Sequence, residues 1–223
     1  MKESGRIFIY LFLFTFIMTF LFNVCMIDIN PIHEGMQIKE RNIIILGDSA
    51  FDNRPYVGTS ESIPYLLQNH DIFKSVVLAR DGAKISDLHQ QIRSAEKDLG
   101  KSNRTTFISI GGNDILTLKD GQIDIDKTIR KLFTTYTKIL SNYTFKSKLV
   151  LCNIYIPFSK RGSFHEKCIK KWNEQLYMFS KENNYNLMRF DKVLFEQNDF
   201  VDNLEPSRIG GRKIVGEMLN YVD

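Results

Sequence analysis

The chain has 223 residues, of which 43% are hydrophobic and 25% charged, so it is long enough for one well-packed domain. Its formal net charge is +4 and its basic residues are scattered, which gives no support to nucleic-acid binding. The three cysteines lack zinc-ligand spacing, and their odd number argues against a disulfide framework.

An uncharged apolar run covers residues 7–27 and follows Lys2 and Arg6. As a helix it would span roughly 31 Å, about one membrane hydrocarbon core. The flanking positive charges place the rest of the chain on the non-cytoplasmic side, periplasmic or extracellular. The run is longer than a usual signal-peptide core and no small-x-small cleavage site follows, which favours a signal anchor over a cleaved peptide. Cleavage would make the protein secreted. Residues 28–41 are interpreted as a tether and residues 42–223 as the folded domain.

The run Ile43-Ile44-Ile45-Leu46 predicts a short strand buried on both faces. It leads directly into Gly47-Asp48-Ser49, where the glycine permits a backbone bend that other residues resist. A serine at the carboxyl end of such a strand lies where open α/β sheets bind their ligands, a suitable place for a nucleophile. Alone, the tripeptide is equally well explained as an ordinary turn.

The following segments alternate between strand and helix. Apolar runs predict strands at residues 73–78, 105–110, 148–156 and 187–190. Helical spacing predicts helices that begin near Ser60 or Ser62 and that cover residues 85–99, 125–140, 164–179 and 206–219. This order predicts a three-layer α/β/α sandwich with a mostly parallel five-stranded sheet.

Ser49, Gly82 and Asn113 each follow one of the first three predicted strands. Because parallel strands end at one edge of the sheet, we expect these residues to meet in one crevice. Acyl transfer needs a nucleophile, a base and donors for the developing oxyanion. Ser49 supplies the hydroxyl, and its N–H, the Gly82 N–H and the Asn113 amide are candidate donors. Taken singly, Gly82 is as well explained as a turn residue and Asn113 as a helix cap.

As a set, these blocks resemble the SGNH hydrolase superfamily, the GDSL-type esterases and lipases. Gly47-Asp48-Ser49 matches the nucleophile block, Gly82 the second block, and Gly111-Gly112-Asn113-Asp114 the third. The resemblance covers residues 42–221. It implies a flavodoxin-like fold, ester hydrolysis through a seryl intermediate, no metal or organic cofactor, and substrates that are acyl esters of small molecules, lipids or glycans. For an anchored protein, acyl groups on lipid or surface glycan are the suggested target.

The last block departs from the family pattern Asp-x-x-His-Pro-Ser. Here it reads Asp202-Asn203-Leu204-Glu205-Pro206-Ser207, so Glu205 stands at the position of the catalytic histidine and Asp202 at that of its partner. A carboxylate with its ordinary pKa of about 4.3 is a weak base near neutral pH. Burial and a nearby negative charge would raise that pKa towards a useful range.

Three interpretations of this departure stay open. In the first, Glu205 itself is the base for Ser49. In the second, another histidine enters the site, with His165 after the fourth strand the best placed, although a solvated loop histidine is the plainer interpretation. In the third, catalysis is lost and the domain binds acylated glycans or a protein partner.

Overall fold

The computed structural model describes residues 41–99, 104–121 and 123–222. The anchor expected at residues 7–27 and nearly all of the expected tether lie outside these ranges. Within them, no helix is long and apolar enough to cross a membrane.

Five parallel strands form the central sheet in the order β2-β1-β3-β4-β5, which confirms the predicted parallel sheet. Their bounds are β1 (Arg41–Gly47), β2 (Phe73–Val77), β3 (Arg104–Ser109), β4 (Lys148–Cys152) and β5 (Asn186–Met188). The predicted fourth strand was too long. The chain leaves the sheet at Asn153, whose backbone N–H still donates to the Met188 carbonyl (3.1 Å) while its side-chain amide donates to Asp191 (2.6 Å).

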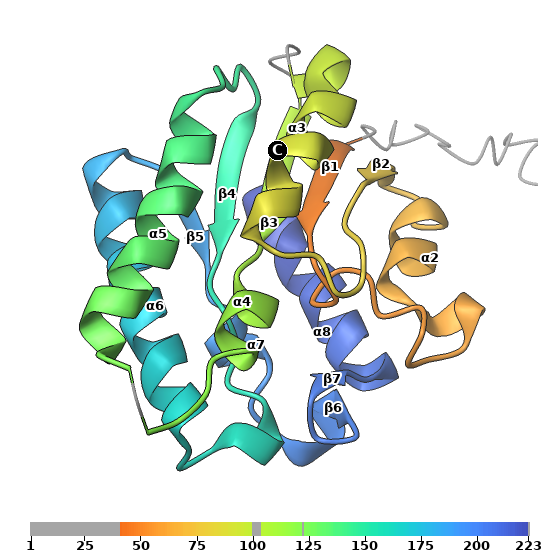
Figure 1. Ribbon diagram of the computed structural model, residues 1–223. Helices are drawn as coiled ribbons and strands as arrows, with labels where there is room; N and C mark the ends of the chain where they lie inside the picture. The colour runs from red at the N-terminus through yellow and green to blue at the C-terminus, as the bar shows by residue number, and fades with distance from the viewer. Residues whose placement is uncertain (1–40, 100–103, 122, 223) are drawn as a thin grey trace, which may run out of the picture. The chain divides into compact units, whose positions relative to one another are not determined.

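Helices cover both faces of the sheet, which confirms the three predicted layers (Figure 1). One face carries α3 (Ile85–Leu99), α4 (Gly112–Leu116), α5 (Ile125–Ser141) and α6 (Phe164–Glu182). The other carries α2 (Ile63–Gln68), α7 (Phe190–Val193) and α8 (Arg208–Met218). Short 3-10 turns cover Thr59–Glu61, Phe158–Lys160, Gln197–Asp199 and Leu219–Tyr221.

β1 lies inside the sheet and contributes side chains to both cores. Ile44 and Leu46 pack into the cluster on the α3 side, while Ile43 and Ile45 pack into the cluster on the α8 side, and all four are fully buried. A one-residue slip would exchange the two sets of side chains, so this packing fixes the position at which the strand ends. The turn after β1 is therefore set by the core.

The chain passes from β1 to β2 on one side and then returns to β3 on the other. This reversal of strand order makes a crevice at the carboxyl ends of β1 and β3, the usual ligand site of open α/β sheets. Ser49 follows β1 and Asn113 follows β3, so both lie at this edge.

A second, two-stranded antiparallel ladder joins β6 (Phe200–Val201) to β7 (Glu205–Pro206). Asp202 and Asn203 make the turn with φ of 50° and 57°, a conformation that Asp and Asn tolerate better than most residues. The predicted start of the last helix at Pro206 was wrong, because Pro206 pairs with Phe200 in this ladder. The helix begins at Arg208 with Ser207 as its N-cap, whose hydroxyl accepts from two backbone N–H groups of the first turn.

Candidate active site

The turn that carries Ser49 is fixed by Gly47 and Gln91. Gly47 has φ of 140°, and a Cβ there would lie 1.9 Å from the Ser109 carbonyl oxygen, so only glycine fits. Gln91, from α3, accepts from the Gly47 N–H (2.7 Å) and donates to the Gly47 carbonyl (2.8 Å). The sequence analysis missed Gln91, since a helical glutamine carries no local signal of a contact this distant along the chain. Its two bonds hold the nucleophile turn rigid.

Ser49 and Glu205 come from opposite ends of the domain and meet in the structure. The Ser49 hydroxyl lies beside the Glu205 carboxylate and favours its ionised form, and both residues line one cavity. Both residues are buried, with 6% and 7% of their surfaces exposed. Tyr155, in the loop after β4, donates its hydroxyl to Oε2 of the same carboxylate at 3.4 Å. The Glu205 carboxylate therefore lies where a general base for the Ser49 hydroxyl would have to lie.

The surroundings of Glu205 change its basicity. Burial raises the pKa of its carboxyl above the ordinary value, and the negative charge of Asp81 adds to this. The hydroxyls of Ser49 and Tyr155 favour the ionised form and partly oppose the shift. The net upward shift moves Glu205 towards the range in which a carboxylate accepts a proton at neutral pH.

Asp48 places a second carboxyl at the same site. Desolvation raises its pKa to about 7, opposed by the Ala50 N–H that donates to Oδ1 (3.1 Å) and reinforced by the charges of Glu205 and Asp114. Among the described residues, no basic side chain forms an ion pair with Asp48. With two acidic neighbours and one recorded donor, Asp48 binds its proton up to near-neutral pH.

Among the three expected oxyanion donors, Asn113 has the clearest position. Its side chain lines the same cavity as Ser49 and Glu205, and its Nδ2 donates to the Ala83 carbonyl (3.0 Å), which leaves a second N–H for a ligand. Among the described hydrogen bonds, neither the Ser49 N–H nor the Gly82 N–H has an acceptor. Gly82 lies on the neighbouring loop with φ of 73° and does not line the cavity.

Asp202 and the histidines stand apart from this group. Asp202 is exposed in the β6–β7 turn, and no hydrogen bond or ion pair among the described contacts joins it to Glu205. His165 lies in the first turn of α6, with Nε2 at 3.2 Å from the Leu118 carbonyl oxygen. None of the histidines within the described ranges lines the cavity. His33 lies outside them.

Tyr155 contacts the Glu205 carboxylate, whereas Asp202 does not. Burial and the charges of Glu205 and Asp48 raise its pKa well above the ordinary value, so it stays a neutral donor. Sequence reasoning missed this contact, because Tyr155 lay within a strand predicted to be longer than it is.

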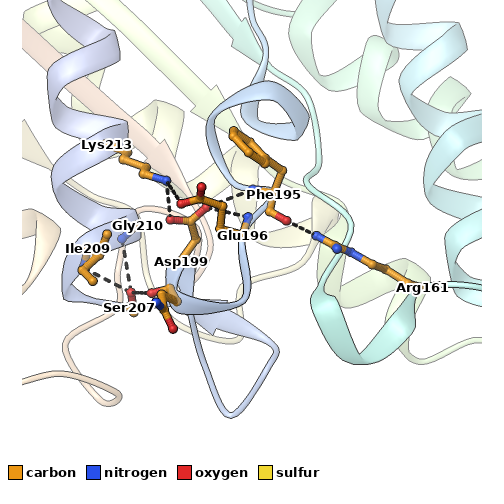
Figure 2. Close-up of polar contacts among 9 residues, drawn as sticks. Arg161, Phe195, Glu196, Asp199, Ser207, Ile209, Gly210 and Lys213 are labelled. Carbon is orange, nitrogen blue, oxygen red and sulfur yellow. Dashed lines mark hydrogen bonds and ion pairs between the residues drawn. The ribbon is translucent and has the colours of Figure 1, made fainter.

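The hairpin that carries Glu205 is held by buried polar contacts, which Figure 2 shows. Asp199, fully buried, accepts from the backbone N–H groups of Phe195 (3.0 Å) and Glu196 (2.9 Å). Lys213, from α8, lies 2.7 Å from Asp199 Oδ1 and 2.9 Å from Glu196 Oε2. The Ser207 N–H donates to the Asp199 carbonyl (2.8 Å), so this ion pair anchors the segment that follows Glu205.

Asn53 joins the nucleophile loop to the same segment. Its Nδ2 donates to the Pro206 carbonyl (3.0 Å), and its Oδ1 accepts from the Ile63 N–H (2.8 Å). Asn53 is fully buried, so these two hydrogen bonds replace bonds to water. They connect the two loops. The separation between Ser49 and Glu205 is thereby set by backbone positions on both sides.

The polar groups converge on a small cavity of about 30 Å³, whose lining includes Asp48, Ser49, Asn113, Tyr155 and Glu205. Within the described ranges, no three His, Cys, Asp or Glu side chains gather as a metal site. What the arrangement offers chemically is a hydroxyl beside a carboxylate, with an amide donor near both.

Solved structures share this architecture. The chain aligns with a member of the lipolytic protein G-D-S-L family from Veillonella parvula at a TM-score of 0.65 and 20% identity, covering 81% of this chain and 97% of that chain. It aligns with the psychrotrophic esterase EstA from a Pseudoalteromonas species at 0.58 and 18%, covering 81% and 96%. A GDSL-like lipase from Bacteroides thetaiotaomicron gives 0.57 and 14%, covering 81% and 87%. No protein-family model and no curated protein matches the sequence. These likenesses confirm the expected resemblance at the level of the fold, which is that of the SGNH/GDSL-type hydrolases.

Proposed function

We propose that this protein is a serine hydrolase of the SGNH type that cleaves carboxylic esters, with Ser49 as nucleophile and Glu205 as base. The observation that carries the proposal is that the Ser49 hydroxyl and the buried Glu205 carboxylate line one cavity, where the hydroxyl favours the ionised carboxylate. The shared cavity adds the Asn113 amide, and the fold is one that known esterases use. Nucleophile, base and oxyanion donor are the parts that acyl transfer needs.

In the first half-reaction, Oγ of Ser49 attacks the ester carbonyl carbon while its proton passes to the Glu205 carboxylate. The new Oγ–C bond forms as the carbonyl electron pair moves onto oxygen, where the Ser49 N–H and the Asn113 amide stabilise the charge. Collapse breaks the bond to the alcohol oxygen. The Glu205 carboxylic acid then gives its proton to the departing alkoxide, so the alcohol leaves neutral.

In the second half-reaction, water attacks the acyl-serine and its proton passes to Glu205. The second tetrahedral adduct breaks the Oγ–C bond, Glu205 returns the proton to Ser49, and the carboxylic acid leaves. Tyr155 fixes the orientation of the carboxylate in both halves through its contact with Oε2. The exposed position of Asp202 gives it no direct part in this scheme.

The location we propose is the non-cytoplasmic face of a membrane, with residues 7–27 as a signal anchor. Support comes from the sequence: an uncharged run of membrane-spanning length behind basic residues. On that face, acyl groups on lipid or surface glycan are substrates within reach. Cell fractionation with and without detergent tests the anchor, because an anchored chain pellets with membranes until detergent is added.

Hydrolysis of p-nitrophenyl acetate by the full-length protein in detergent tests the reaction. We expect Ser49→Ala to abolish enzymatic hydrolysis and Glu205→Gln to reduce kcat at least a hundredfold. Ser60→Ala and Glu182→Gln, both at exposed positions, are matched controls and should hydrolyse the ester at the wild-type rate.

Equal rates for wild type and Ser49→Ala would contradict the proposal. That result would support the competing function, a catalytically inactive domain that binds acylated glycans or a protein partner. The observation that favours it is the Glu205 carboxylate in place of an imidazole.

A further inference from the structure

The cavity beside Ser49 is lined by both polar and apolar side chains. The polar ones are those of Asp48, Ser49, Ser109, Asn113, Tyr155 and Glu205. Apolar side chains come from Leu116 of α4, from Ile154 and Pro157 in the loop after β4, and from Ile169 of α6. These four side chains offer no hydrogen bond, so a group that packs against them must be apolar.

The volume of the cavity limits what that group can be. It encloses about 30 Å³. A cavity of about 150 Å³ lined by apolar side chains holds benzene, which is roughly 25 Å³ for each carbon atom. By that measure the space beside Ser49 accepts about one carbon atom, the size of the methyl group of an acetyl ester.

The tetrahedral adduct on Ser49 carries three other substituents, and only one of them fits beside the apolar side chains. The oxyanion must face the Asn113 amide, and the leaving oxygen must lie near Glu205, which protonates it. The acyl substituent is therefore the one that meets the apolar side chains of the cavity lining.

We propose that this cavity is an acyl pocket which accepts acetyl and excludes acyl chains of four or more carbons, so that the substrates are acetyl esters. Leu116 and Ile169 set the limit from two different helices. The inference rests on the proposed hydrolase function, because it assigns the acyl side of that reaction.

A chain-length series of p-nitrophenyl acetate, butyrate and octanoate, with the full-length protein in detergent, tests the proposal. We expect kcat/KM for acetate to exceed that for butyrate at least tenfold, with octanoate lower still. Leu116→Ala removes part of the wall and should raise the butyrate-to-acetate ratio of kcat/KM at least tenfold. Leu118→Ala is the matched control, because Leu118 lies two residues further on and does not line the cavity.

A second variant fills the pocket instead of opening it. A Cβ at Gly112 would lie 3.5 Å from Asp48 Oδ2 and 3.9 Å from Ile154 Cγ2, ordinary contact distances, so Gly112→Ala adds a methyl group without a clash. We expect kcat/KM for acetate to fall at least tenfold while the unfolding midpoint is not lowered. Gly216→Ala, in α8 with nothing within 4 Å of its Cβ, controls for a helical Gly→Ala change and should keep wild-type activity.

The possible outcomes distinguish a failure of the acyl-pocket proposal from a failure of the proposed hydrolase function. Hydrolysis that depends on Ser49 but is as fast for octanoate as for acetate would overturn the acyl pocket and leave the hydrolase. An unchanged acyl preference in Leu116→Ala, together with full acetate activity in Gly112→Ala, would do the same. Hydrolysis that Ser49→Ala does not affect would instead overturn the proposed function.

Discussion

The substitution Asp48→Asn removes one titrating carboxyl from the site and keeps the shape of the side chain. In the folded chain the pKa of Asp48 is raised from 3.8 to about 7, mainly because burial disfavours the charged form. A raised pKa means that the folded state binds the proton more tightly than the unfolded state. The resulting stability is fully present below about pH 4 and is lost as the pH rises through 7.

The size of the effect follows from the shift. Each pKa unit is worth about 1.4 kcal/mol, so a shift of about 3 units gives about 4 kcal/mol between the two limits. Between pH 5.5 and pH 8, ionisation of Asp48 should lower the free energy of unfolding by about 2 kcal/mol. Asp48→Asn cannot ionise, and its side-chain oxygen can still accept from the Ala50 N–H. The variant should therefore lose about 2 kcal/mol less than wild type over this interval.

Urea unfolding of the full chain in a mild detergent, at both pH values, measures this difference. Trp172 is the only tryptophan and is buried, so its fluorescence reports loss of the core. Asp71→Asn, at an exposed position, is the control and should change with pH as wild type does. An Asp48→Asn protein whose stability falls between pH 5.5 and 8 as much as wild type would refute the assignment of this proton to Asp48.

Three further changes test the supports of the site. Tyr155→Phe removes a hydrogen bond that favours ionised Glu205, so kcat should fall about tenfold and the acidic limb of the pH–rate profile should move to higher pH; an unmoved limb would exclude this contact. Gln91→Leu removes the acceptor of the Gly47 N–H and leaves the Gly47 carbonyl with the Arg80 N–H alone, and urea unfolding should show a loss of about 2 kcal/mol together with slower acetate hydrolysis. Lys213→Met leaves the carboxylate of Asp199 buried without its cation and should cost about 3 kcal/mol in the same assay, whereas a loss below about 0.5 kcal/mol would show that the pair does not support the hairpin.

The nucleophile side of the site could be predicted from the sequence because its signals are local. A run of branched residues sets β1, Gly47 allows the turn, and Ser49 follows at the strand end. The same rule placed Asn113 after β3. Parallel strand order then brings both residues to one edge without any knowledge of side-chain contacts.

The base side depends on contacts between distant segments, which no local pattern encodes. Pro206 reads as the first residue of a helix, yet its pairing with Phe200 makes it a strand residue. Tyr155 reaches Glu205 only because β4 ends at Cys152. The raised pKa of Asp48 depends on burial and on acidic neighbours that only the folded chain brings together.

Covalent labelling of Ser49 tests the central claim most directly, because it needs no knowledge of the substrate. The full-length protein in detergent is treated with a fluorophosphonate, and the adduct is located and timed by peptide mass spectrometry. We predict one adduct on the peptide that contains Ser49, formed at least a hundredfold more slowly in Glu205→Gln and absent in Ser49→Ala. An unlabelled wild-type Ser49, or equal labelling rates in wild type and Glu205→Gln, would contradict the claim that this carboxylate activates the hydroxyl.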